Sequence, residues 1–187
     1  PPDVFLHSAG TAFGVNDPRI ALAVANGSDY GMGSTIVGGD HTTTCELLGG
    51  TAGDDRTIAM AWRQAAGGEK SELISDVLSL EGTGDDTYVL QMSYNANWGT
   101  SAYLAWLDGN EWINAVAGNT GGTPAFFDAA YDAGDHFTLG YHGVDTTNHL
   151  AWAVLNHNSQ FAVVPEPGSA LMLLAGGAAL GVLRRKR

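Results

Sequence analysis

The sequence predicts an all-β protein, an antiparallel β-sandwich or jelly-roll-like domain followed by a single C-terminal transmembrane helix. Three observations support this fold class. Several short segments alternate apolar and polar residues with period two. The connectors between them are short and rich in Gly, Asn and Asp, with 26 Gly in 187 residues. A single stretch, 168–183, is apolar and uncharged throughout.

We divide the chain into three parts on this basis. Residues 1–50 are weakly patterned and are either the first strands of the domain or a fragment of a preceding region. Residues 51–164 are predicted to form the β-sandwich, and residues 165–187 a C-terminal tail. The opening residues have neither a basic n-region nor a long apolar run, so we expect no signal peptide here. Either processing has removed one or the chain is a fragment of a longer one, and we favour the fragment.

The first clear strand is 57–63, where Ile58, Met60 and Trp62 alternate with two alanines. Residues 73–80 form a second apolar segment, and 87–94 alternate again. Between these last two lies Gly82-Thr-Gly-Asp-Asp86, which has the composition of a turn. We therefore expect a hairpin from 73 to 94.

The strongest hairpin signal is Asp108-Gly109-Asn110, which separates 102–107 from 111–116, because Asp-Gly readily adopts the positive φ of a tight turn. A loop is expected at 118–123. Three more strands are then predicted, at 136–141, 149–155 and 160–164, with turns at 143–148 and 156–159.

The charge distribution excludes nucleic acid as a partner. The chain holds 8 Lys+Arg and 20 Asp+Glu, and four of the bases are the last four residues, Arg184, Arg185, Lys186 and Arg187. Without those bases and Glu166, residues 1–164 keep 4 bases and 19 acids, a formal charge of −15. A body of this charge cannot displace counterions from phosphates.

The C-terminus joins three unlike segments: Val164-Pro165-Glu166-Pro167, the apolar stretch 168–183, and the basic cluster 184–187. As a helix, 168–183 would measure about 24 Å, slightly less than a hydrocarbon core of roughly 30 Å. Bilayer thinning and snorkelling arginines can compensate. The basic cluster predicts a cytoplasmic C-terminus by the positive-inside rule.

This order of motif, apolar span and basic terminus resembles the PEP-CTERM sorting signal of exported bacterial proteins, which the membrane enzyme exosortase recognises. The resemblance covers residues 164–187. It implies a protein held transiently in the inner membrane by 168–183, cut near Pro165-Glu166-Pro167, and then released or attached to the cell surface or extracellular polymer matrix, where exopolysaccharide is a possible partner. It implies no catalytic residue.

The sequence contains no nucleophile elbow and no zinc-binding or phosphate-binding motif. We therefore expect that the protein is not an enzyme and has no cofactor. Asp54, Asp55, Asp85, Asp86, Asp132 and Asp135 are weak candidates for Ca²⁺. Clusters of Asp and Gly are also common in turns, and we favour a turn over a calcium site at each of these positions. His41 and Cys45, four residues apart, could in principle ligate a metal, but a site also needs partners with matching geometry. We favour a lone thiol beside a polar loop. A hydrolase of unfamiliar type would need a pocket that pairs carboxylates or histidines.

Aromatic residues suggest an alternative, a carbohydrate-binding module of a larger secreted protein. The set comprises Tyr94, Trp98, Tyr103, Trp106, Trp112, Tyr141 and Trp152. We expect most of them to fill the core and form cross-strand pairs. Alternation around Trp106 also predicts that one face of that strand meets solvent. The alternative requires a flat, exposed patch of two or three of these rings.

Overall fold

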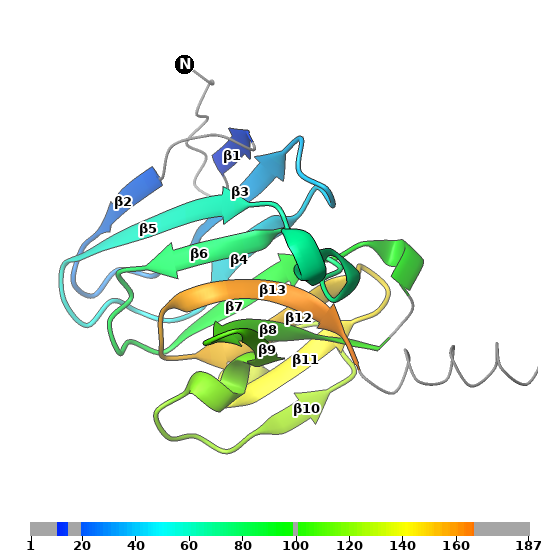
Figure 1. Cartoon of the computed structure of the whole chain (residues 1–187). Coiled ribbons are helices and arrows are strands. Elements are labelled where there is room, and N and C mark those ends of the chain that lie inside the picture. Colours follow the sequence, from blue (N-terminus) through cyan, green and yellow to red (C-terminus); the bar gives the residue numbers. More distant parts are fainter. Residues whose placement is uncertain (1–10, 15–19, 99–100, 167–187) are drawn as a thin grey trace, which may run out of the picture.

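The computed structural model describes residues 11–14, 20–98 and 101–166, which form two sheets packed face to face (Figure 1). The prediction of an all-β domain is confirmed. Both sheets are mainly antiparallel, but β1 pairs with β3 and β10 with β11 in parallel, so the sheet containing them is mixed. Within these residues no helix is long and apolar enough to cross a membrane. The predicted transmembrane helix, 168–183, lies outside them.

Within the described residues, one sheet has seven strands and the other six, and the order in the first is β1-β3-β4-β7-β12-β11-β10. Their bounds are β1 Thr11–Gly14, β3 Met32–Val37, β4 Thr44–Leu48, β7 Tyr88–Ser93, β12 Leu150–Leu155, β11 Tyr141–Asp145 and β10 Ala125–Phe127. The second has six in the order β2-β5-β6-β13-β8-β9. Their bounds are β2 Ile20–Val24, β5 Arg56–Arg63, β6 Val77–Glu81, β13 Ser159–Pro165, β8 Ala102–Asp108 and β9 Glu111–Asn114. Short helical turns are η1 Gly67–Ser71, η2 Ala96–Trp98, η3 Ala115–Gly118 and α1 Ala133–His136.

Residues 20–48 contribute strands to both sheets. β2 pairs with β5, and β4 pairs with β7 through Cys45 opposite Met92. The sandwich therefore includes strands that precede Thr51.

The central strands are buried on both faces. In β12, Ala151, Ala153 and Leu155 face the core between the sheets, whereas Trp152 and Val154 pack on the outer face with Phe127. The same alternation occurs in β13, whose outward residues pack against Ala65 and Leu73 from the connection that contains η1. Burial of both faces explains why these strands read as continuous apolar runs. It also shows that the expected solvent face beside Trp106 is wrong, because Ala105 is fully buried in this outer cluster.

The hairpin at residues 108–110 is confirmed. β8 and β9 pair antiparallel with Asp108 opposite Glu111, and Gly109 has a φ of +62°. Two residues thus close the turn, as local turn chemistry requires.

The hairpin expected between 73–80 and 87–94 is wrong. Residues 82–86 connect different sheets, since β6 pairs with β5 and β13, whereas β7 pairs with β4 and β12. Thr83 is instead held by Asn158, which accepts hydrogen bonds from its N–H at 3.0 Å and its hydroxyl at 2.6 Å. Turn composition predicts a change of direction, and both a hairpin and a crossover between sheets satisfy it.

The strand expected at 136–141 is also wrong. Asp132 caps α1 by accepting hydrogen bonds from the N–H groups of Gly134 and Asp135, and the chain becomes extended only at Tyr141. The turn expected from 143 is correspondingly too early, because β11 runs to Asp145. Gly143 lies within this strand, and its lack of a side chain is explained by packing, because an added Cβ would lie 2.6 Å from the Trp152 ring.

Candidate functional site

The predicted sorting motif begins inside the last strand of the domain. β13 lies between β6 and β8 (Figure 1), and Phe161 is paired with Leu78 on one side and Trp106 on the other. The pairing with β8 continues to Pro165, which lies opposite Ala102. The N–H of Glu166 then donates a hydrogen bond to the Ser101 carbonyl at 3.0 Å. No spacer separates the sandwich from the motif.

The other edge of β13 is held by the segment that precedes β6. The N–H of Val163 donates to Ser75 Oγ at 2.7 Å, and the Val163 carbonyl accepts from the N–H of Ile74 at 2.9 Å. Val163 is fully buried and Val164 is 5% exposed. The backbone is therefore fixed on both sides as far as Val163, and on the β8 side as far as Glu166.

The side chain of Glu166 lines a groove of about 320 Å³ at this end of the domain. The other lining residues are Ser101, Phe126, Asp128, Val144 and Thr146. Phe126 is 49% exposed and contacts the ring of His142 at a centroid distance of 5.7 Å. Burial lowers the pKa of His142, and the Gly140 carbonyl and the Glu166 charge offset this only in part. His142 is therefore neutral at pH 7, and none of the described residues that line this groove carries a positive charge.

Pro167 and the orientation residues Arg184, Arg185, Lys186 and Arg187 lie outside the described residues. The geometry of the predicted site thus comes from Val164, Pro165 and Glu166.

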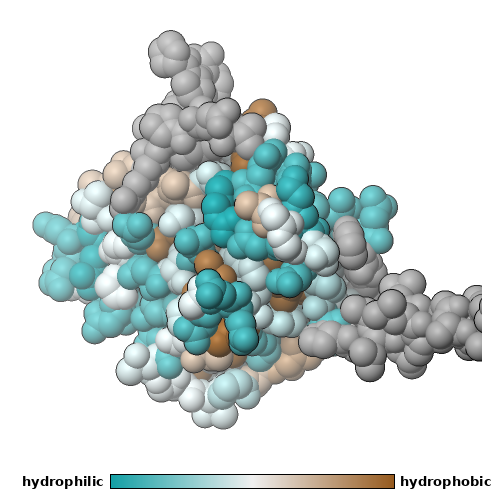
Figure 2. Space-filling view, viewed as in Figure 1, coloured by the Kyte–Doolittle hydropathy of each residue, from teal (hydrophilic) through white to brown (hydrophobic). Residues whose placement is uncertain are grey.

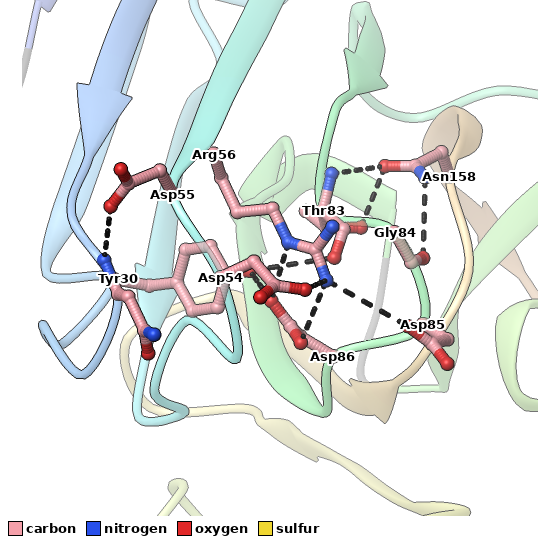
Figure 3. A network of polar contacts seen from close by, with 10 residues as sticks. Tyr30, Asp54, Asp55, Arg56, Thr83, Gly84, Asp85, Asp86 and Asn158 are labelled. Carbon is pink, nitrogen blue, oxygen red and sulfur yellow. Dashed lines mark hydrogen bonds and ion pairs between the residues drawn. The ribbon is translucent and has the colours of Figure 1, made fainter.

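Three of the six calcium candidates surround an arginine (Figure 3). Arg56 Nε lies 3.0 Å from Asp86 Oδ2, and its Nη2 lies 3.9 Å from Asp54 and 3.8 Å from Asp85. Tyr30 donates a 2.6 Å hydrogen bond to Asp86. A guanidinium thus occupies the centre of this cluster, where a cation would otherwise neutralise the carboxylates.

The arginine also determines how Asp86 ionises. Burial favours the neutral carboxyl, but hydrogen bonds from Arg56, Tyr30 and the Gly53 N–H together lower the pKa of Asp86 below its ordinary value. In Tyr30, burial and the neighbouring Asp86 raise the pKa of the phenol.

The remaining calcium candidates have separate structural partners. Asp55 accepts a hydrogen bond from the Asn26 N–H at 2.9 Å, and Asp132 caps α1, the turn that contains Asp135. No group of three or more His, Cys, Asp and Glu side chains is arranged to hold a metal ion in the described part of the chain.

Sequence reasoning missed a buried carboxylate, Asp76. It accepts hydrogen bonds from the N–H groups of Asp40 and His41 and from the Thr43 hydroxyl, at 3.0 to 3.2 Å, while its own N–H donates to Thr43 Oγ1 at 2.8 Å. Asp76 thereby ties the β3–β4 connection of one sheet to the start of β6 in the other. The available signal was a single charge within the apolar segment 73–80.

His41 and Cys45 differ in burial: His41 is partly exposed, whereas Cys45 is not. Cys45 is fully buried in the core, within 3.1 Å of Ser34 Oγ, and burial raises the pKa of its thiol to about 12. A thiol in this environment stays protonated and is a poor metal ligand or nucleophile.

The aromatic residues fill the domain. Trp152 and Tyr94 are buried, Trp106 packs against the central core, Tyr103 and Trp112 against the cluster of Ala105, and Tyr141 against that of Trp152. The described part of the chain exposes three large hydrophobic residues, Val37, Phe126 and Phe137. In Figure 2 the visible face is mostly hydrophilic or neutral, and its hydrophobic areas are small and separate. The described side chains thus include no flat patch of exposed Trp or Tyr; that of Trp98 is not among them.

Comparison with known proteins gives a match for the tail alone. The family model of the PEP-CTERM protein-sorting motif matches residues 163–187. No curated protein and no solved structure matches the chain. The match begins at Val163, within β13, so the motif and the last strand of the sandwich overlap. The chain therefore carries at its C-terminus the PEP-CTERM protein-sorting motif of exported proteins that are sorted by exosortase.

Proposed function

We propose that this protein is a non-catalytic, acidic surface or extracellular-matrix component that exosortase processes at its tail. Residues 168–183 hold the chain transiently in the inner membrane with the basic C-terminus in the cytoplasm. Exosortase then acts near Pro165-Glu166-Pro167, and the sandwich is released or attached to the cell surface or the exopolysaccharide matrix. The observation that carries this proposal is the sorting motif at 163–187, whose first residues form the end of the last described strand of the domain.

The charge of the body supports a location in solvent outside the cell. The described bases are Arg56, Arg63 and Lys70, and each lies in an ion pair, with Asp86, Glu69 and Asp40 respectively. Loss of the basic tail leaves a strongly acidic domain. Such domains repel one another and remain soluble.

The absence of catalytic activity is part of the proposal. It is supported by the structural roles of the groups that most resemble chemical ones. Asp76 joins two sheets, the Asp86 carboxylate is bound by Arg56, and the Cys45 thiol is enclosed in the core.

Replacing Pro165, Glu166 and Pro167 together by alanine tests the sorting step. We expect the full-length variant to stay in the membrane fraction, because exosortase no longer recognises it, whereas the unaltered chain is released. The measurement is the distribution of the protein between membrane and soluble fractions of cells that contain exosortase.

A matched control is Pro124→Ala combined with Glu111→Ala. It replaces the same residue types at exposed positions outside the motif, so release should be as in the unaltered chain. Unchanged release of the triple-alanine variant would contradict the sorting assignment.

A further inference from the structure

We propose that the folded sandwich restricts exosortase cleavage to peptide bonds C-terminal to Glu166, and that the pairing of β13 with β8 slows the cut by holding the start of the motif. This inference rests on the proposed function, because it concerns where and how fast the same enzyme acts. It follows from the overlap between the motif and the last strand.

A peptidase takes its substrate as an extended segment whose backbone N–H and C=O groups bind the enzyme. From Phe161 onward those groups are already used in β13. Phe161 is paired with both β6 and β8, the pairing with β8 continues to Pro165, and Val163 bonds to Ser75 and Ile74 on the other side. An enzyme cannot add a strand to a backbone with no free edge. The bonds from Phe161 to Val164 are therefore shielded in the folded protein.

Exposing those bonds would require loss of the fold. β13 is an interior strand of its sheet, and its inward residues Phe161 and Val163 are fully buried in the core. Removing the strand would separate β6 from β8 and open the core. Local fraying at Pro165 and Glu166 is much easier, because beyond Val164 the backbone is held on the β8 side only, ending with one hydrogen bond to Ser101.

For the released product, the reaction is hydrolysis of one amide bond. The C–N bond beyond Glu166 breaks, and water supplies the hydroxyl of the new carboxyl terminus and the proton of the new amino terminus. The mature domain then keeps Pro165 opposite Ala102 and Glu166 on Ser101, so its sheet is unchanged by processing.

The side chain of Glu166 gives the second part of the proposal. It lines a groove of its own domain beside Phe126 and Thr146. An enzyme that recognises the Glu166 side chain must therefore contact this end of the sandwich or break the hydrogen bond between Glu166 and Ser101. If a spacer moves the motif away from β13, the enzyme no longer has to break this contact, and cleavage should be faster.

The test compares three full-length chains in cells that contain exosortase. One is unaltered, one carries Gly-Ser-Gly-Ser between Val164 and Pro165, and one carries the same insertion between Gly121 and Gly122, in an exposed connection. The measurements are the C-terminus of the released protein, by mass spectrometry, and the rate of processing, by pulse-chase. Circular dichroism establishes that both variants fold.

We expect the unaltered chain to end at Glu166 or later. The variant with the spacer before Pro165 should be cut at the same bond of the motif and several-fold faster, and the variant at Gly121 at the unaltered rate. A released protein that ends at Pro165 or earlier, or a spacer that gives no acceleration, would overturn this inference alone. If the unaltered chain is never cut, the proposed function fails and the inference fails with it.

Discussion

At the scale of single residues, the acidic body is organised by a few specific contacts. Asp86 is the clearest case, because its carboxylate accepts hydrogen bonds from Arg56 Nε and Nη2 and from the Tyr30 hydroxyl, and its side chain is only 9% exposed. Asp85 lies 3.8 Å from the same guanidinium but is 98% exposed. Solvent screens a pair of that kind, whereas hydrogen bonds to a buried carboxylate contribute to stability.

Asp86→Asn should therefore destabilise the domain by about 1–3 kcal/mol at pH 7, the usual range for hydrogen bonds to charged groups. Because the pKa of Asp86 is lowered in the folded state, its contribution is fully present above the unfolded pKa, at about pH 4. That contribution is lost as the pH falls through the folded pKa. Urea unfolding of both proteins between pH 7 and pH 3 should show the difference between them shrinking below about pH 4.

Asp85→Asn is the matched control, since it removes a carboxylate from the same arginine. We expect its stability to stay within about 0.5 kcal/mol of the unaltered protein at every pH. Equal effects of the two substitutions would show that Asp86 has no special role.

The sequence could predict the composition of this site but not its contacts. Gly53-Asp54-Asp55 and Gly84-Asp85-Asp86 suggested turns or weak cation sites, and both are turns in which acidic side chains gather. The contact that neutralises them joins Arg56 to a residue 30 positions away. Periodicity and turn chemistry are local signals and carry no information on such a pairing.

At the scale of elements, a turn formed by residues close in sequence was predicted correctly, whereas a connection that depends on contacts between distant residues was not. The turn at Gly109 is specified by adjacent residues and was predicted correctly. The connection 82–86 depends on which sheet each flanking strand joins, a choice made by contacts with β4, β12 and β13. The same turn composition therefore misled the prediction there.

Gly143 illustrates a second limit, because a glycine can mark either a turn or a close contact. It lies in β11, where an added Cβ would meet the Phe127 carbonyl and, at 2.6 Å, the Trp152 ring. Gly143→Ala should destabilise the domain by about 1–3 kcal/mol, the usual cost of overpacking. Thermal unfolding measures the loss.

Gly68→Ala provides the comparison for that substitution. Gly68 lies in η1 with nothing within 4 Å of an added Cβ and no positive φ, so the change should be neutral or slightly stabilising. If both alanine variants unfold at the temperature of the unaltered domain, β11 does not pack against Trp152 as described.

At the scale of the whole molecule, the order of strands along the chain gives the C-terminus its importance. The last strand, β13, fills the gap between β6 and β8, so the six-stranded sheet is complete only when the chain has emerged as far as Glu166. The sorting motif overlaps this end of the sheet, because its match begins at Val163. If exosortase processes the chain as proposed, a cut beyond Glu166 would release an intact domain.

The sorting tail could be predicted from sequence because its three parts are contiguous and differ sharply in composition. The overlap of its motif with an interior strand could not, since the alternation of 160–164 indicates a strand but not its neighbours. The tail also accounts for half of the basic residues of the chain. Removal of the tail, as proposed, would take away these four bases and leave a more acidic domain.

The most direct test of the account is the intact mass of the protein released by cells with exosortase and by otherwise identical cells without it. With the enzyme, the account predicts a released species that lacks the basic cluster 184–187 and the apolar segment before it. Without the enzyme, all of the protein should have the full mass and remain in the membrane fraction. Released protein that still carries Arg187 in both strains would contradict the account.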